Sequence, residues 1–302
     1  MEKIKSFDDL IRHLSERSDR KRVAVVWASD DHTQEAISMA LKGGFMHAIC
    51  VGARQEIEQS EYLRPYMDHI EIVDAADKDA AAAKAVEIVR EGNADVLMKG
   101  LINTDNLLHA VLNKEHGILP KGRVLTHIAA ADIPTYPKLL FFTDAAVIPY
   151  PTHEQRIEQV RYVSELCHSF GIEEPRIALN HCTEKPNEKF FPFTLGYAEI
   201  KEKAAAGEFG KCIVDGPLDL KTSCNLEALQ TKGLDSPLQG EADAIIFPDI
   251  EAGNVFYKAV TTFCPSEMAA MLKGPLAPVV LTSRGDSVKS KFYSLALAII
   301  SC

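Results

Sequence analysis

Runs of β-branched and apolar residues alternate with helical patterns along the whole chain, and this alternation is the feature that most restricts the fold. Runs typical of strands lie at 23–27, 48–51, 70–73, 95–98, 139–142, 176–179, 212–214, 244–247 and 279–282. Apolar spacing predicts helices at 33–41, 79–90, 106–113, 154–169 and 253–271, the last interrupted near Pro265. Such alternation predicts a mostly parallel sheet with helices on its faces, and ligands bind beyond the carboxyl ends of such strands.

Composition and charge narrow the class of partner. With 46% hydrophobic and 25% charged residues, the chain has the composition of a soluble globular protein, and 302 residues suffice for two domains. Lys and Arg total 33 against 43 Asp and Glu, a net charge of −10 that argues against nucleic acid as the main partner. The start lacks an apolar signal core, and no apolar run is long enough to span a membrane. We therefore expect a cytoplasmic protein.

Cysteine and histidine spacing offers little support for metal or thiol chemistry. Seven scattered cysteines without a Cys-x-x-Cys pair predict reduced, mostly buried thiols. His181 precedes Cys182, but adjacent residues of a strand point to opposite faces, which disfavours a nucleophile with its base. No His-x-x-x-His or Asp-x-Asp pattern appears, so no metal site is expected. The glycine-rich fingerprints of dinucleotide and P-loop sites are also missing.

The last strand, turn and helix have the features of an anion site. Strand 279–282 leads through Ser283, Arg284, Gly285, Asp286 and Ser287 into helical spacing from Val288 to Ile300. The unpaired N–H groups of a helix's first turn favour negative charge, and the Arg adds a fixed cation beside two hydroxyls and a carboxylate. The chemistry fits a phosphoryl group. For Asp286, capping of the helix is an equally good interpretation.

Other segments repeat this strand-loop-helix pattern. Lys99 and Gly100 follow strand 95–98, and Thr104 is the predicted N-cap of the next helix, which makes a second anion contact. The alternative is that Lys99 is a surface lysine. Asp249, Glu251 and Asn254 cluster beyond strand 244–247, where Gly253 is expected to open a helix.

Two more segments carry weaker signals. Asp-Gly-Pro within Ile213–Leu218 predicts that a strand ends there in a turn, and Asp215 is either part of that turn or a ligand contact. Thr126 and His127 offer a hydroxyl and an imidazole to a ligand. The alternative for His127 is a partly buried histidine whose hydrogen bonds are met inside the protein.

Several of these segments together resemble the phosphate acetyl/butyryltransferase family. The resemblance runs from about Val23 to Ile300 and is closest to the butyryltransferases. Its motifs are Lys99-Gly100 with Asn103-Thr-Asp-Asn-Leu-Leu108, Thr143-Asp-Ala-Ala146, Asp215-Gly-Pro-Leu218, Pro248-Asp-Ile-Glu-Ala-Gly-Asn-Val-Phe-Tyr-Lys258 and Leu281-Thr-Ser-Arg-Gly-Asp-Ser287. The Pro-Asp-x-x-x-Gly-Asn segment and the Ser-Arg pair are specific, and the other pieces support them.

The resemblance implies a reversible exchange of an acyl group between CoA and inorganic phosphate, with acyl-CoA, phosphate and acyl phosphate as partners. CoA would be a co-substrate, with no tightly bound cofactor, and a homodimer is expected. The implied fold is similar to that of isocitrate and isopropylmalate dehydrogenases, with three-layer α/β domains and a cleft between them. The break at Ile148–Thr152 and the return of the C-terminal helix then predict one domain at 1–149 plus 279–302 and a second at 150–278.

The resemblance also suggests roles for the residues. Ser283, Arg284 and Asp286 would be catalytic in a direct attack of the CoA thiolate on the acyl phosphate. Substrate contacts would come from Lys99, Gly100, Thr104, Thr126, His127, Asp249, Asn254 and Ser287. In acetyl-specific members an Asp six residues after the Arg is thought to deprotonate the thiol, and here that position is Ser290. The general base is therefore open among Asp286, water, CoA itself and another loop.

Three alternatives remain at this stage. The first is phosphate acetyltransferase, because the residues that line the acyl pocket are not identified by the sequence. The second is a metal- and NAD-dependent hydroxy-acid dehydrogenase of similar architecture, which needs clustered carboxylates such as Asp215, Asp219 and Asp249. The third is a CoA-binding protein without turnover, suggested by Ser290.

Overall fold

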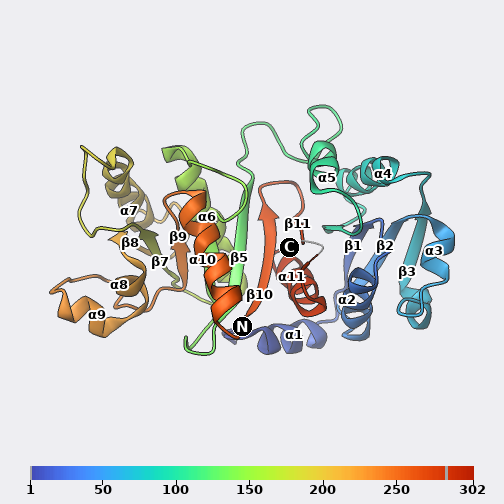
Figure 1. The fold of residues 1–302 in the computed structure, drawn as a ribbon, viewed down its shortest axis with the longest axis horizontal. Helices are drawn as coiled ribbons and strands as arrows, with labels where there is room; N and C mark the ends of the chain where they lie inside the picture. Colours follow the sequence, from blue (N-terminus) through green and yellow to red (C-terminus); the bar gives the residue numbers. More distant parts are fainter. Residues whose placement is uncertain (1, 283–284) are drawn as a thin grey trace. The chain divides into compact units, whose positions relative to one another are not determined.

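A computed structural model describes residues 2–282 and 285–302, and these residues form two compact units (Figure 1). Unit 1 is Thr126–Ser266 with the N-terminal residues through Ser6, and unit 2 is Phe7–Leu125 with Glu267–Cys302. The sequence placed domain boundaries after residues 149 and 278 instead. The two divisions differ because β5 and β6 pair within the sheet of unit 1, whereas β10 pairs with β11 in unit 2.

Unit 2 contains a largely parallel sheet. Its strands are β1 Lys21–Val26, β2 Met46–Gly52, β3 Ile70–Asp74, β4 Val96–Lys99, β10 Glu267–Lys273 and β11 Val279–Val280, in the order β3-β2-β1-β4-β11-β10. Only β10, among the described strands of this unit, runs antiparallel to its neighbour, β11. Its helices are α1 Phe7–Glu16, α2 Asp31–Lys42, α3 Arg54–Glu58, η1 Arg64–His69, α4 Lys78–Arg90, α5 Thr104–Val111 and α11 Val288–Ile300.

Helices cover both faces of the unit 2 sheet. On one face α11 packs on β10 and β11 and contacts α1 and α2, and on the other α4 packs on β1, β2 and β4 and contacts α5 (Figure 1). The apolar residues of β1 are fully buried, as expected of a strand covered on both sides. Helix α11 is buried at every residue from Lys291 to Ile300, which makes it the central helix of this unit.

Unit 1 has a five-stranded mixed sheet among its described residues. Its strands are β5 Thr126–Asp132, β6 Leu140–Thr143, β7 Arg176–Asn180, β8 Ile213–Leu218 and β9 Ala244–Ile246, in the order β5-β6-β9-β7-β8. Strands β5 and β6 are antiparallel, and the remaining neighbours are parallel. Its helices are α6 His153–Ser169, η2 Pro192–Gly196, α7 Tyr197–Ala205, α8 Leu220–Cys224, α9 Leu226–Thr231 and α10 Ile250–Phe263.

The structure corrects three sequence predictions. Strand β5 was not predicted, because Thr126–Asp132 is rich in Ala and lacks the β-branched residues that mark a strand. The predicted helix 253–271 is wrong in its second half, because α10 ends before Pro265 and Glu267–Lys273 forms β10. The predicted turn at Asp215-Gly-Pro lies inside β8, where a register shift between Ala178 and Asn180 of β7 accommodates it. Among the described residues, no helix combines the length and apolar character needed to cross a bilayer.

The end of β4 depends on a residue without a side chain at position 100. The Gly100 N–H donates to Val26 O at 2.9 Å, and an added Cβ would lie 2.4 Å from Trp27 O and 2.6 Å from Val26 O. We expect Gly100→Ala to lower the free energy of unfolding by about 1–3 kcal/mol, because backbone atoms would have to move. Urea denaturation measures this.

The matched control is Gly52→Ala, at the end of β2, the strand on the other side of β1. Its added Cβ would come no closer than 3.4 Å to Trp27, which is ordinary contact. We expect its stability to stay within about 0.5 kcal/mol of the parent. Equal losses for the two variants would refute the close-approach argument.

Candidate active site

In unit 2, Lys99 lies buried at the carboxyl end of β4. Register pairs Met98 with Val280 of β11, so Lys99 lies beside Leu281 and Thr282, which directly follow β11. The Lys99 side chain is only 3% exposed, and its Nζ lies 3.4 Å from the carbonyl oxygens of Gly100 and Thr282. The alternative interpretation as a surface lysine is therefore wrong. A buried ammonium at this edge of a parallel sheet is positioned for an anionic ligand.

Lys291, in the first turn of α11, is a residue that the sequence reasoning missed. Its Nζ donates to Thr282 Oγ1 at 3.2 Å, and the residue is 3% exposed. Burial lowers its pKa, while the carboxylates of Asp30 and Asp286 act in the opposite direction. The sequence signal that could have identified it is the position of this lysine directly before Phe292, within the apolar helical pattern of the segment.

The start of α11 is capped by Ser287. Its Oγ accepts a hydrogen bond from Ser290 N at 3.1 Å, which corrects the interpretation of Asp286 as the N-cap. Asp286 precedes the cap and is partly buried. Ser283 and Arg284, which the sequence assigns to the centre of the site, lie outside the described residues.

Thr104 does not have the capping role that was predicted for it. Helix α5 begins at Thr104 itself, so the N-cap is Asn103, whose side chain makes no capping hydrogen bond. Thr104 is exposed, whereas Gly100 is buried at the preceding turn. At the start of α5, the group available for the predicted anion contact is therefore the exposed hydroxyl of Thr104.

In unit 1, the buried carboxylate of Asp144 organises the ends of β5 and β6. Asp144 Oδ2 accepts hydrogen bonds from Thr126 Oγ1 at 2.8 Å and from His127 N at 3.0 Å. Its Oδ1 accepts from the N–H groups of Ala146 and Val147, each at 2.8 Å. Asp144 is 1% exposed, and its four hydrogen bonds offset the free-energy cost of burying a charged carboxylate. Asp144 belongs to the Thr143-Asp-Ala-Ala146 motif, but no role was predicted for it.

Thr126 and His127 serve this network in different ways. The Thr126 hydroxyl lies 2.9 Å from Thr143 Oγ1 and accepts from Gln159 Nε2 at 3.3 Å, and the residue is fully buried. It is therefore engaged within the protein. His127 is buried, with its ring edge-on to Tyr257 at 6.4 Å between centroids.

Helix α10 is attached to the 143–147 loop at its first turn. Asp249 is its N-cap and accepts from Ala252 N at 2.8 Å, and Asn254 Nδ2 donates to Ala145 O at 3.0 Å. An added Cβ at Gly253 would lie 2.0 Å from Asp144 O, so the helix approaches the loop as closely as glycine permits. The helix starts at Ile250 rather than at Gly253 as predicted. Asn254 thus holds this loop directly, whereas Asp249 fixes the start of the helix that carries Asn254.

The carboxylates that a metal-dependent dehydrogenase would need are held in separate contacts. Asp215 pairs with Lys201 at 3.2 Å and accepts from Ser236 at 2.7 Å. Asp219 caps α8 and pairs with Lys232; burial opposes this charge, but Lys232 and Thr222 lower the pKa of Asp219 to about 2. Asp249 caps α10 as described above, so these groups have structural roles of their own.

The sulfur of Cys182 lies near the His181 ring. The distance from Sγ to Nδ1 is 3.8 Å, so the expectation that the two side chains diverge is wrong, because they follow β7 instead of lying in it. Burial lowers the pKa of His181. The wider prediction of mostly buried thiols holds for Cys50 and Cys167, whereas Cys182 and Cys302 are exposed and the other cysteines are intermediate.

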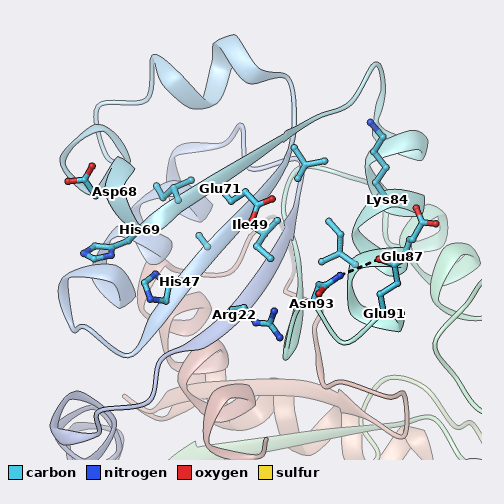
Figure 2. Close-up of a pocket in the computed structure, with 14 residues that line it drawn as sticks. Arg22, His47, Ile49, Asp68, His69, Glu71, Lys84, Glu87, Glu91 and Asn93 are labelled. Atoms are coloured by element: carbon cyan, nitrogen blue, oxygen red, sulfur yellow. Dashed lines mark hydrogen bonds between the residues drawn. The ribbon is translucent and has the colours of Figure 1, made fainter.

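A cavity of about 1040 Å³ lies elsewhere in unit 2, beside β2, β3 and α4 (Figure 2). Its charged lining comprises four acidic residues, Asp68, Glu71, Glu87 and Glu91, against the basic Arg22 and Lys84, together with His47 and His69. The acidic excess disfavours a phosphorylated ligand there. The candidate site residues named above are not part of this lining.

Comparison with known proteins identifies the family. The model of the family described as "Phosphate acetyl/butaryl transferase" matches residues 77–299. The chain belongs to the phosphate acetyl/butyryltransferase family. Over 299 residues it is 40% identical to a phosphate butyryltransferase of Clostridium acetobutylicum, with 98% of each chain covered. As a member of this family the chain is a phosphate butyryltransferase-like acyltransferase.

Solved structures confirm the α/β fold of this acyltransferase. A branched-chain phosphotransacylase from Enterococcus faecalis superposes with a TM-score of 0.79 and 31% identity, over 93% of this chain and 98% of that one. A 4-hydroxythreonine-4-phosphate dehydrogenase from Klebsiella pneumoniae gives a TM-score of 0.53 at 12% identity, over 93% of this chain and 100% of that one. The second likeness concerns the fold alone, and it agrees with the predicted isocitrate dehydrogenase-like architecture.

In this acyltransferase the Asp144 network predicts a large effect of a small change. Asp144→Asn keeps the shape but replaces one acceptor oxygen by an N–H₂ donor facing N–H groups. We expect the free energy of unfolding to fall by about 2–3 kcal/mol, measured by urea denaturation.

The control for this change is Asp249→Asn at the N-cap of α10. Asn caps a helix about as well as Asp, so the same substitution there should alter stability by less than about 0.5 kcal/mol. An Asp144→Asn variant as stable as this control would show that the four hydrogen bonds do not hold the loop.

Proposed function

We propose that this acyltransferase moves a butyryl or similar short acyl group between CoA and inorganic phosphate. The observation that carries the proposal is the 40% identity, across 98% of both chains, to a phosphate butyryltransferase. The likeness to a branched-chain phosphotransacylase supports an acyl group larger than acetyl. The buried Lys99 at the carboxyl end of β4 supports a phosphoryl ligand at this edge of the sheet.

The proposed mechanism is direct transfer in a ternary complex. The CoA thiolate forms a C–S bond with the carbonyl carbon of the acyl phosphate, and the C–O bond to the phosphoryl group then breaks. The thiol first gives its proton to the base, and phosphate then leaves with the electron pair of the broken C–O bond. Arg284 would bind the phosphoryl oxygens, and Ser283 would donate to the oxyanion of the tetrahedral intermediate.

The thiol needs only modest activation. A thiol pKa near 8.5 leaves a few per cent of thiolate at neutral pH, so a strong base is not required. Ser290 replaces the expected Asp, and its hydroxyl accepts a hydrogen bond from Ser287 Oγ at 3.2 Å. We assign the base role to Asp286, whose partly buried carboxyl precedes the cap of α11.

The remaining residues have binding or supporting roles in the proposal. In this proposal Lys99, Gly100, Thr104, His127 and Ser287 contact phosphate or CoA. Thr126 and Asn254 act through the 143–147 loop, because their side chains are engaged there. Asp249 acts by capping α10, the helix that carries Asn254.

We also propose a homodimer. Val255 and Phe263 of α10, 68% and 84% exposed, favour this assembly, which sedimentation velocity tests against a monomer.

The acyl preference is tested by comparing acetyl-, butyryl- and isobutyryl-CoA in phosphate-dependent release of CoA. We expect kcat/KM for butyryl- or isobutyryl-CoA to exceed that for acetyl-CoA by about tenfold or more, as expected when extra methylene groups fill an apolar pocket. A preference for acetyl-CoA would make the chain a phosphate acetyltransferase, which the family description also covers. CoA binding without exchange of any acyl group would indicate a binding protein instead.

Arg284→Ala tests the catalytic centre. Loss of a charge that stabilises the transition state should lower kcat/KM by about 100-fold or more, whereas Arg12→Ala should leave it unchanged. Arg12 is an exposed arginine of α1, paired with Asp9, and serves as the control. Turnover of Arg284→Ala within about threefold of the parent would remove Arg284 from the mechanism.

A further inference from the structure

We propose that the cavity beside β2, β3 and α4 is a second binding site, which takes a small aliphatic amine (Figure 2). The alkyl chain of the amine lies on an apolar floor, and carboxylates of the lining hold its ammonium group. Strands β1 to β4 are parallel, and Arg22, His47 and Ile70 place the cavity near the amino ends of β1, β2 and β3. Lys99 ends β4 at the opposite edge of this sheet. The site is therefore separate from the candidate active site.

The floor of the cavity is apolar because the edge of the sheet is incompletely covered. Strand β3 is the outermost strand, and α4 packs mainly on β1, β2 and β4. As a result Ile70, Val73 and Ile88 are only half-buried, and they line the cavity together with the buried Ile49. An alkyl chain that covered these side chains would remove apolar surface from water, which favours binding.

A carboxylate stands on this apolar floor. Register pairs Glu71 of β3 with Ile49 of β2, so their side chains lie next to each other on one face of the sheet. Among the described residues, no side chain donates to the carboxylate of Glu71 or to that of Asp68, which also lines the cavity. A ligand whose alkyl chain lies on the floor thus places its charged end beside a carboxylate.

Two more carboxylates come from α4 (Figure 2). Glu87 lies in the last turn of this helix, where it pairs with Arg90 at 3.7 Å, and Glu91 is the C-cap and accepts from Asn93 at 3.2 Å. The carbonyl groups at the carboxyl end of a helix carry partial negative charge, which favours cations. The helix side of the cavity therefore adds to the attraction exerted by Glu71.

The basic residues of the lining are engaged by groups of the protein. Lys84 Nζ donates to Asp74 O at 2.6 Å, and Arg22 Nε lies 3.8 Å from Asp95 Oδ2, which is outside the lining. Burial lowers the pKa of His47, which keeps its ring neutral at pH 7. Four carboxylates against two cations leave the lining with an excess of negative charge. This excess favours an amine over a carboxylic acid of the same length.

The test compares three probes of equal chain length, n-hexylamine, 1-hexanol and hexanoate, by ligand-observed NMR with the full chain. We expect n-hexylamine to bind about fivefold or more tightly than 1-hexanol, and hexanoate to bind more weakly than both. Raising the salt concentration should weaken binding of the amine and leave binding of the alcohol unchanged, because salt screens only the ionic contact.

Variants locate the binding. Glu71→Gln keeps the size of the side chain and removes its charge, so the dissociation constant for n-hexylamine should rise about fivefold while that for 1-hexanol stays the same. Ile88→Ala should weaken binding of both, because it removes part of the floor. Glu56→Gln is the control, because Glu56 is an exposed residue of α3 outside the lining, and it should match the parent. Glu87→Gln is measured in the same way in case Glu71→Gln does not fold.

Four outcomes would overturn the proposal. Equal affinities for the three probes would leave an apolar site without selectivity for a cation. An unchanged preference for the amine in both Glu71→Gln and Glu87→Gln would place binding elsewhere. Displacement of n-hexylamine by CoA would show that the amine occupies the substrate site. Binding of Ca²⁺, added as its chloride, together with absence of n-hexylamine binding would indicate a metal site. These measurements do not involve acyl transfer, so they stand whether or not the proposed function is correct.

Discussion

The cost of burying a charge is the constraint on which the candidate site depends. Asp144 in unit 1 and Lys99 and Lys291 in unit 2 are each at most 3% exposed, and each would lose several kcal/mol of hydration if it were not compensated. For Asp144 the compensation comes from the protein, through a hydroxyl and three backbone N–H groups. For the lysines, the oxygens of Gly100 and Thr282 provide part of it.

These charges explain the local order of the surrounding elements. The Asp144 hydrogen bonds fix the 143–147 loop. Near the start of α10, Gly253 packs closely against this loop and Asn254 donates a hydrogen bond to it. In unit 2, Thr282 links β4 to α11 through its two lysine contacts. Neither arrangement follows from helix or strand propensity. Both require polar atoms that are distant in sequence to be placed within hydrogen-bonding distance.

The sequence predicts the local pattern well and the buried polar contacts poorly. Alternating strand and helix runs identified β1, β4 and α11, because their apolar periodicity is strong. Strand β10 was taken for helix, because a short apolar run such as Met268–Leu272 fits either period. The burial of Lys99 depends on the parallel pairing of β4 with β11, which joins segments about 180 residues apart. The motif residues nevertheless identified the family, which the comparisons confirm.

The most direct measurement is a crystal structure of the enzyme with inorganic phosphate and CoA bound. The account predicts a phosphate ion at the carboxyl end of β4, with an oxygen within about 3 Å of Lys99 Nζ. A phosphate ion bound elsewhere, with no oxygen near Lys99, would contradict it.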